Sequence, residues 1–578
     1  MRTIPAVSGE SREAFLLKIK VVAINARFTH SSLALFYLRN ELEKHLDHVA
    51  VEICQYTIND PHYVLLQRLA TGNPDYIFFS ALIWNSDQVE KMIEDLLVID
   101  DQCRFVVGGP QAGIVGRKFK NRERVTIFQG DIEAAGSAFY HDLQRLAPAP
   151  FYRGSFLKLS APSLDYPYRP EDFAGPLKNR HIYYETSRGC PFSCSYCLSS
   201  AETGLFHKDF EQVRTELDDI LAHEPKVVRF LDRTFNDHPK RALKIWQYLK
   251  EKGGNTLFHF EIAPHRFTDE MLVFLEGVEP GRFQFEIGIQ STNPETLKRI
   301  GRKMDVEETA RIISRLRSME NIHLHADLIL GLPAETEDSF ARSFNDVFAM
   351  RPHYIQMGLL KILPDTPISL EVNTCGYRHS RAVPYSVVAT AWLTAAQIRA
   401  CFWFGECVEI CFNNRYFITF WDYLYHRKED MFTFFRALSE RFLEEGCFWK
   451  GTTQETLSRL LQAQVKNRQD YQVLHELLCY DWLRCGHRFL PKNLHCAGIT
   501  IDELRRKLYR ELPGAINGLY DQKNRKHFFK KGVFYLFSRE SLAHIGYEIN
   551  AAHGIVRFGP EREENVFRLN QVCLVSEL

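Results

Sequence analysis

The first 145 residues alternate between short runs of β-branched and aromatic side chains and amphipathic stretches of 8 to 16 residues. The two patterns predict strands and helices, respectively. Strands are expected at residues 18–25, 51–56, 76–80 and 104–107, and helices at 31–46, 63–70 and 86–98. Strict alternation of strands and helices along the chain is typical of a parallel sheet with helices on both faces. We therefore predict an α/β, doubly wound domain over residues 1–145, with ligands bound beyond the carboxyl ends of its strands.

A second α/β region is expected after residues 146–180, which contain six prolines and little periodic pattern and are predicted to form a linker. Strands are expected at residues 181–186, 227–232, 257–262, 283–290, 323–330 and 354–360, with helical patterns between them. Six such units in sequence predict a partial (β/α)6 barrel over residues 181–375, with its active site at the carboxyl ends of the strands.

Residues 376–578 are richer in aromatic side chains and in helical periodicity, as at 416–425 and 431–442. They predict a helix-rich C-terminal domain. Short strands are expected again near the end of the chain, within residues 527–537 and 544–558.

Composition limits the possible partners. The 72 basic residues balance 72 acidic ones, so nucleic acid or an anionic membrane would have to be recognised by a local patch. The start of the chain has scattered charges and no long apolar run, and no later segment is apolar enough to span a membrane. These features predict a cytoplasmic protein without a membrane partner, whose 14 cysteines serve as thiols or metal ligands rather than as disulfides.

Three cysteines directly after the first expected strand of the barrel have the spacing CxxxCxxC: Cys190, Cys194 and Cys197. A compact loop can direct three thiolates at one iron-sulfur cluster, and a four-iron cluster with three protein ligands keeps one iron open for an outside molecule. A structural zinc ion would need a fourth nearby ligand, for which only His207 is within reach in the sequence.

The segment resembles the radical S-adenosylmethionine (SAM) superfamily, whose signature is this spacing with an aromatic residue before the third cysteine, here Tyr196. The resemblance implies that the three thiols hold a 4Fe-4S cluster. It also implies that the open iron binds SAM, which one electron cleaves to methionine and a 5'-deoxyadenosyl radical.

Further residues resemble the cofactor-binding positions of that superfamily. Asp232 ends the second barrel strand, where the resemblance implies a contact with the ammonium group of SAM, and a merely polar strand end is the alternative. Glu261, Glu286 and Gln290 resemble the contacts to ribose and carboxylate, and an unpaired carboxylate is costly to bury in an apolar strand. Gly331 lies in a turn similar to the one that packs against adenine, or simply forms that turn.

The expected doubly wound domain lies before the barrel, and the segment at residues 163–168 joins the two. This arrangement resembles the cobalamin-binding subclass of this superfamily. The resemblance implies cobalamin as a further cofactor, with a packing domain as the alternative. Residues 1–145 contain no Asp-x-His-x-x-Gly motif for an axial histidine, and the surroundings of His30 do not match that motif. We therefore expect no histidine ligand from this domain.

Two features of the C-terminal region are open to interpretation. Cys401, Cys407 and Cys411 could hold a second cluster, but their spacing within an apolar helical run favours buried core cysteines. The basic run 523–531 could contact phosphate or nucleic acid, although a solvated face is the simpler interpretation.

The sequence thus predicts a radical SAM enzyme that transfers a methyl group from cobalamin to an unactivated carbon. The substrate would be a small molecule or a peptide, and the electron donor an external protein such as flavodoxin or ferredoxin. The alternatives are ring formation, rearrangement or methylthiolation without cobalamin, and a regulatory iron-sulfur protein without catalysis. No catalytic residue besides the cofactor ligands is indicated by the sequence.

Overall fold

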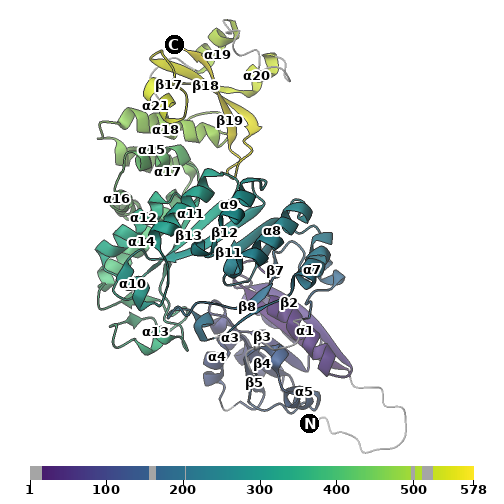
Figure 1. Ribbon diagram of the computed structural model, residues 1–578. Helices are drawn as coiled ribbons and strands as arrows, with labels where there is room; N and C mark the ends of the chain where they lie inside the picture. Colours follow the sequence, from purple (N-terminus) through teal and green to yellow (C-terminus); the bar gives the residue numbers. More distant parts are fainter. Residues whose placement is uncertain (1–15, 121, 155–164, 202–203, 496–500, 511–524) are drawn as a thin grey trace, which may run out of the picture.

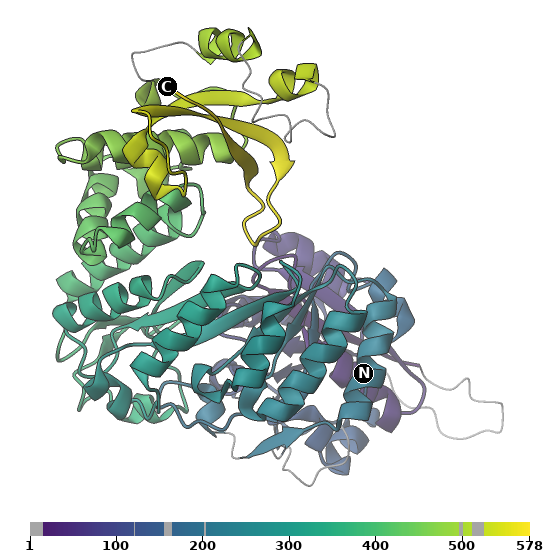
Figure 2. The ribbon, with the colours of Figure 1, turned by 45° about the horizontal axis from the view of Figure 1, so that its top comes forward.

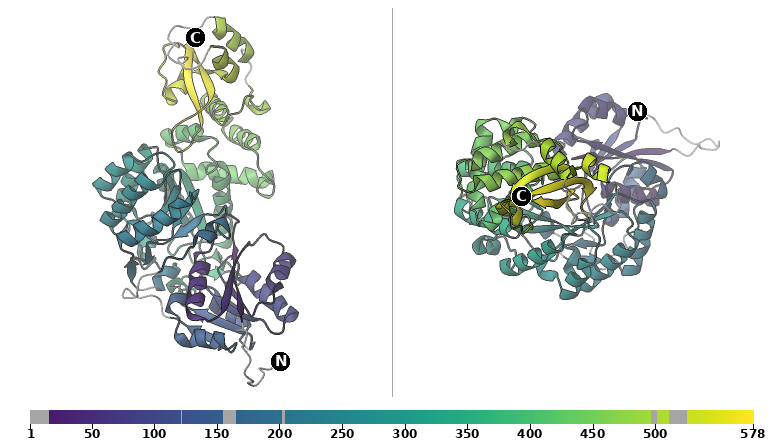
Figure 3. Two further views of the ribbon diagram at one scale, coloured as in Figure 1. Left: turned by 90° about the vertical axis from the view of Figure 1, so that its right-hand side faces the viewer. Right: turned by 90° about the horizontal axis from the view of Figure 1, so that it is seen from above.

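The computed structural model describes residues 16–120, 122–154, 165–201, 204–495, 501–510 and 525–578. Its three parts follow one another along an elongated molecule, with the central barrel between the N-terminal sheet and the C-terminal helices and strands (Figures 1 and 3). None of the described helices has the length and apolar character needed to cross a membrane.

The N-terminal part is a parallel sheet with the strand order β2-β1-β3-β4-β5-β6. Its strands are β1 (Leu17–Asn25), β2 (Val49–Thr57), β3 (Tyr76–Ser80), β4 (Arg104–Gly108), β5 (Val125–Gln129) and β6 (Phe151–Arg153). Its helices are α1 (Leu33–His45), α2 (His62–Ala70), α3 (Ser86–Ile99), α4 (Ala112–Lys118) and α5 (Ser137–Gln144). Separate apolar clusters cover the two faces, which confirms the predicted doubly wound fold.

The strand order reverses between β1 and β3, so their carboxyl ends form the place where such sheets bind ligands. Buried Asn85 fastens this edge, because its amide donates hydrogen bonds to the carbonyls of Ile24 and Ser80 at 3.0 Å each. The sheet also contains β6, which lies within the predicted linker. A strand of three residues between prolines is too short to give a periodic pattern.

The linker is anchored to the first domain through α6 (Pro170–Ala174). Arg39 on α1 forms a bidentate ion pair with Asp172, at 2.6 and 2.9 Å, and both side chains are buried. The first two residues of the segment 163–168 lie outside the described residues.

The central part is a parallel six-stranded sheet in the order β14-β13-β12-β11-β10-β7. Its strands are β7 (Ile182–Tyr184), β10 (Val227–Phe230), β11 (Leu257–Glu261), β12 (Phe283–Gln290), β13 (His323–Leu330) and β14 (Tyr354–Leu359). Its helices are α7 (Phe210–Ala222), α8 (Pro239–Lys252), α9 (Asp269–Glu276), α10 (Pro294–Arg299), α11 (Val306–Ser318) and α12 (Glu337–Ala349). Because β7 and β14 do not pair, the barrel is open on one side, as predicted.

Strict alternation in the barrel strands separates an apolar outer face from a polar inner face. In β12, buried residues alternate with partly exposed ones along the whole strand. Phe260, Phe283 and Phe285 pack outward against Trp246 on α8. The residues between them therefore point into the barrel.

The C-terminal part begins with α13 (Pro367–Leu370) and the short pair β15 (Arg378–His379) and β16 (Val387–Ala389). The helices that follow are α14 (Ala395–Cys411), α15 (Ile418–His426), α16 (Met431–Glu444), α17 (Gln454–Val465), α18 (Tyr471–Arg484), α19 (Ile501–Arg510), α20 (Arg525–Lys531) and α21 (Arg539–His544). Strands are present in both expected late segments, as β17 (Val533–Ser538) and β18 (His553–Arg562), and they form an antiparallel sheet with a third strand that was not expected, β19 (Asn570–Glu577). Residues 527–531, expected to belong to the first of these strands, lie in the helix α20 instead.

One apolar cluster runs through the barrel and the C-terminal helices, so these two parts share a core. The connection between β18 and β19 reaches back to the barrel (Figure 2), where the amide of Val566 donates to the carbonyl of Glu320 at 3.2 Å. The β18–β19 connection therefore contacts the amino ends of the barrel strands.

Candidate functional site

The three cysteines of the CxxxCxxC motif lie in a loop beyond the carboxyl end of β7. The loop starts from β8 (Ser187–Gly189), which pairs with β9 (Leu205–His207). Gly189 has φ +98°, and a Cβ at this position would lie 2.1 Å from the carbonyl oxygen of Gly204, so only glycine fits. Backbone hydrogen bonds of Ser195 to Ile300 and Ile368, each at 3.0 Å, hold the loop over the barrel.

None of the three cysteines is in a disulfide; Cys194 is buried, and Cys190 and Cys197 are partly exposed. Burial raises the pKa of Cys190, which the backbone at Phe192 and the hydroxyl of Thr234 oppose. Among the residues the structure describes, no three metal-ligating side chains are close enough to hold a single metal ion. A zinc ion needs four ligands around one centre, whereas a cubane cluster takes its ligands on separate irons, so the donor set fits the cluster.

Arg302 links the cysteine loop to β12, a contact that the sequence analysis missed. One of its nitrogens lies 3.8 Å from the sulfur of Cys194, and another donates a hydrogen bond to the carbonyl of Gly288. A guanidinium here places positive charge beside thiolates and beside any anionic group that binds near them. Arg302 is 108 residues from Cys194 in the chain, so no local pattern indicates the contact.

Asp232 lies behind the cysteine loop, fully buried. Its carboxylate accepts hydrogen bonds from the amide of Thr186 at 2.9 Å, the hydroxyl of Thr186 at 2.5 Å and the hydroxyl of Ser187 at 2.6 Å. These residues join β7 to β8. In this structure Asp232 therefore fixes the segment that leads to Cys190 and presents no open face to a ligand.

Glu261 and Glu286 face each other across the β11–β12 ladder, on the inner side of the barrel. Glu286 lies 3.0 Å from the ring of His259 and 3.7 Å from Arg229. Burial alone would raise the pKa of Glu286, but the hydrogen bond from His259 and the nearby positive charge lower it. Glu261 makes no hydrogen bond or ion pair with a described residue, and burial raises its pKa to about 7.

Gln290 ends β12 at a bulge, with φ 72°. Its side-chain oxygen is buried and accepts no hydrogen bond from a described residue, so it is available to a ligand. Gly331 begins the turn after β13 with φ +93°. The buried carboxyl of Glu335 holds this turn, accepting a hydrogen bond from Ser291 at 3.0 Å, and burial raises its pKa to about 8.

The inner face carries further charged and polar groups that the sequence analysis did not single out. On β13, His325 and Asp327 lie 3.0 Å apart and point to the same side as Glu286. They follow Arg229 and His259 around the barrel interior. A polar residue at every second position of several strands is the signal that could have found them.

The carboxyl edge of the N-terminal sheet covers the open side of the barrel. On the β7 side, the ring of His30 lies 2.5 Å from the hydroxyl of Tyr183. Near the end of β14, the hydroxyl of Tyr385 donates to Gln111 at 3.0 Å. Loops from β1 and β4 therefore face the barrel interior, so a ligand on this edge would also contact the barrel.

The structure describes the three cysteines of the C-terminal region fully and the basic run only in part. Cys401, Cys407 and Cys411 are buried along α14, and burial raises the pKa of Cys401 and Cys407. They pack in the shared core, as the simpler interpretation expected. In the basic run, 523 and 524 lie outside the described residues, while Phe528 and Phe529 are buried.

Comparisons with known proteins agree with this arrangement. Residues 184–347 match the family model of the radical SAM superfamily, and residues 373–546 match one described as a protein of unknown function, DUF4080. The chain is 25% identical over 362 residues to 2-(S-pantetheinyl)-carbapenam-3-carboxylate methyltransferase of Streptantibioticus cattleyicolor, which is 56% of this chain and 52% of that protein. It is 23% identical over 359 residues to the cobalamin-dependent radical SAM methyltransferase TokK of Streptomyces tokunonensis, 54% of this chain and 51% of that one. The chain thus spans about half the length of these curated relatives.

A solved structure extends the likeness beyond the barrel. The cobalamin-dependent S-adenosylmethionine radical enzyme OxsB superposes with a TM-score of 0.56 at 14% identity, covering 81% of this chain and 80% of that one. At this identity the likeness concerns the fold alone. The chain therefore contains a domain of the radical SAM superfamily over residues 184–347, between a doubly wound domain and a helix-rich C-terminal domain, and its fold resembles that of a cobalamin-dependent radical SAM enzyme.

Proposed function

We propose that this protein is a radical SAM enzyme that transfers a methyl group to an unactivated carbon with the help of cobalamin. The observation that carries the proposal is the CxxxCxxC loop, which places three cysteines outside any disulfide at the mouth of a polar barrel beside Arg302. When bound, the 4Fe-4S cluster and cobalamin would supply the electron and the methyl group.

The residues around the loop would bind and orient SAM. Gln290 offers a buried oxygen without a partner, Glu261 and Glu286 offer carboxyl groups on the inner face, and the turn at Gly331 offers backbone. Asp232 would act as a positioning residue for the cysteine loop rather than as a ligand of SAM, because its oxygens already accept three hydrogen bonds.

Cobalamin would lie between the carboxyl edge of the N-terminal sheet and the open side of the barrel. That edge faces the polar interior through the loops of His30 and Gln111. The methyltransferase relatives named above are matched over more than half of this chain, including residues outside the barrel. Methylthiotransferases such as RimO of Chlamydia abortus match over only 218 residues, which favours the cobalamin-dependent reaction.

The remaining expectations belong to the same proposal. The substrate would be a small molecule or a peptide, and the electron donor a protein such as flavodoxin or ferredoxin. A cytoplasmic location would keep the cluster thiols reduced.

The test of the proposal is anaerobic reconstitution with iron, sulfide and cobalamin. We expect about four irons per chain, their loss when Cys190, Cys194 and Cys197 are all replaced by Ala, and formation of 5'-deoxyadenosine from SAM with a strong reductant. A triple variant with undiminished iron and visible absorption would refute the ligand assignment. A loaded cluster that leaves SAM intact would favour a regulatory iron-sulfur protein, and SAM cleavage without cobalamin binding would favour radical chemistry of another kind.

A further inference from the structure

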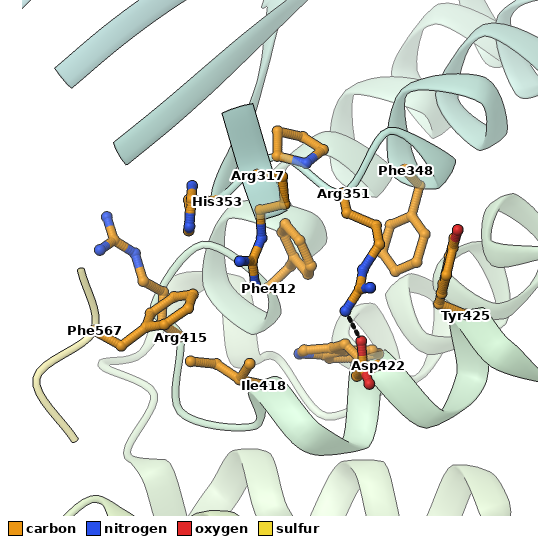
Figure 4. Close-up of a pocket in the computed structure, with 12 residues that line it drawn as sticks. Arg317, Phe348, Arg351, His353, Phe412, Arg415, Ile418, Asp422, Tyr425 and Phe567 are labelled. Carbon is orange, nitrogen blue, oxygen red and sulfur yellow. Dashed lines mark hydrogen bonds and ion pairs between the residues drawn. The ribbon is translucent and has the colours of Figure 1, made fainter. Parts of the chain in front are cut away.

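A cavity of about 60 Å³ lies at the amino ends of β13 and β14, between the barrel and the C-terminal helices (Figure 4). Its walls come from the ends of α11 and α12, the residues before β14, α15 with the connection that precedes it, and the connection between β18 and β19. The volume corresponds to roughly four water-sized groups, about the size of a small oxyanion. The cysteine loop lies beyond the carboxyl end of β7, at the opposite end of the parallel sheet, so this cavity is separate from the proposed active site.

The walls carry more positive than negative charge. Arg317, Arg351 and Arg415 line the cavity, and Asp422 is its one acidic lining residue in the described part of the chain. Asp422 pairs with Arg351, as Figure 4 shows. Among the described residues, the acidic neighbour of Arg317 is Glu320, 3.7 Å away and 62% exposed.

Arg415 lacks a carboxylate partner among the described residues. One of its nitrogens donates to the ring of His323, so even this contact is with a neutral acceptor. Burial lowers the pKa of both Arg317 and Arg415; for Arg317 the nearby charge of Arg351 adds to this effect and Glu320 opposes it. Desolvated charges of this kind are costly unless something pairs with them.

His353 adds a buried donor without an acceptor. The side chain is 3% exposed, and its Nδ1 accepts a hydrogen bond from the amide of Leu324 at 3.0 Å. The proton of the neutral ring is therefore on Nε2, which has no hydrogen-bond partner. An orphaned donor in a cavity wall is stabilised when a ligand supplies the acceptor.

We propose that this cavity binds a small oxyanion, a phosphate or a carboxylate, with Arg317, Arg415 and His353 as its donors. The aromatic rings of Phe412 and Phe567 complete the walls and would contact an apolar group attached to the anion. Because Arg317 belongs to the barrel and Phe567 to the β18–β19 connection, the ligand fastens the C-terminal domain to the barrel. Arg317 already lies 5.5 Å from the centre of the Phe567 ring.

Calorimetry on anaerobically purified full-length protein tests the proposal, with inorganic phosphate and benzoate as separate probes at constant ionic strength. We expect saturable binding of at least one probe, and which one binds distinguishes a phosphate ligand from a carboxylate. Arg317→Gln and Arg415→Gln should each weaken that binding about ten- to a hundredfold, because each removes a charged hydrogen bond. The control is Arg311→Gln on the same helix, whose side chain is exposed and pairs with Glu308, and which should bind as the unaltered protein does.

Hydrogen exchange gives a second measurement that needs no variant. The bound probe should slow amide exchange in residues 563–569, since the ligand contacts the side chain that docks this connection. Absence of saturable binding of both probes to the unaltered protein would overturn the proposal. So would equal affinity in Arg317→Gln, Arg415→Gln and the unaltered protein, or exchange in residues 563–569 that a saturating probe leaves unchanged.

Discussion

Two carboxyl groups on adjacent strands, Glu261 and Glu286, have opposite protonation preferences because their surroundings differ. Glu286 receives a hydrogen bond from His259 and faces Arg229, which lower its pKa despite burial. Glu261 is buried without such a partner, so its pKa rises to about 7 in spite of the charge on Arg233. Near neutral pH one group is therefore an anion and the other is partly a neutral acid. A pair of this kind can accept one hydrogen bond and donate another to the same ligand.

The raised pKa of Glu261 predicts a pH-dependent stability. Its pKa is about 7 in the folded protein against about 4.5 when unfolded, so the folded state binds more protons between these values. The free energy of unfolding therefore falls as pH rises from 4.5 to 7, by at most about 3 kcal/mol. Glu261→Gln stays neutral and should lack this fall. Urea unfolding measures this: relative to the unaltered protein, the variant should have a higher free energy of unfolding at pH 8.5 than at pH 5. An equal difference at both pH values would contradict the raised pKa of Glu261.

Arg302 should matter for the reaction because its charge lies 3.8 Å from the sulfur of Cys194. We expect Arg302→Gln to slow 5'-deoxyadenosine formation by about ten- to a hundredfold, since a charged hydrogen bond contributes about 1.5–3 kcal/mol. Arg302→Lys should recover part of the rate. The neighbouring Lys303→Gln serves as control, because Lys303 is exposed. An Arg302→Gln variant with full iron content, unchanged kcat and unchanged KM for SAM would show that the arginine only holds β12.

At the scale of elements, the sequence was most informative where one short segment contains the whole signal. The CxxxCxxC spacing identified the cysteine loop, and the apolar run at residues 283–290 predicted the strand β12. Contacts that join distant segments left no such signal. The hydrogen bonds of Asp232 with Thr186 span 46 residues, so the sequence could identify a polar strand end but not its burial. The three-residue strand β6 was missed because its pairing with β5 comes from the tertiary fold.

The ion pair between Arg39 and Asp172 should determine how firmly α6 is held against α1. Replacing Arg39 by Met leaves the Asp172 carboxylate buried with only the amide of Arg169, at 2.8 Å, as its donor. We expect the free energy of unfolding of the N-terminal part to fall by about 3–5 kcal/mol. Arg39→Met combined with Asp172→Asn should recover much of this loss, because no unpaired charge remains.

Chemical denaturation followed by far-UV circular dichroism measures both effects. The exposed pair of Arg459 and Glu445 supplies the control, since Arg459→Met should cost less than about 1 kcal/mol. If Arg39→Met and the double variant were equally unstable, the unpaired charge of Asp172 would not be the cause of the instability of Arg39→Met.

At the scale of the whole molecule, the N-terminal sheet and the β18–β19 connection contact different sides of the barrel. The N-terminal sheet presents its carboxyl edge to the open side, through His30 and Gln111. The C-terminal domain shares the core of the barrel and reaches its amino ends through Val566. The polar interior is therefore enclosed by contributions from all three parts. The order of the domains could be predicted because each domain has its own pattern along the chain. The docking of the C-terminal domain could not, because it depends on contacts between residues that are far apart in the sequence.

The arrangement predicts how cobalamin would meet the N-terminal domain. No Asp-x-His-x-x-Gly motif precedes the barrel, and the ring of His30 is already engaged, 2.5 Å from the hydroxyl of Tyr183 and beside the ring of His181. Burial lowers the pKa of His30, with Arg229 and Arg27 adding to the effect, so the ring is neutral and could coordinate if it were free. Its contact with Tyr183 competes with such coordination.

Electron paramagnetic resonance of bound cob(II)alamin can test whether His30 is an axial ligand. Because the ring is held by Tyr183, we expect no nitrogen superhyperfine splitting and an unchanged spectrum in His30→Ala. Tyr183→Phe provides the matched control: it removes the hydroxyl that engages His30, so splitting that appears only in this variant would show that Tyr183 normally withholds the ring from cobalt. Splitting in the unaltered protein that vanishes in His30→Ala would instead make His30 the ligand, and would mean that the loop after β1 rearranges when cobalamin binds.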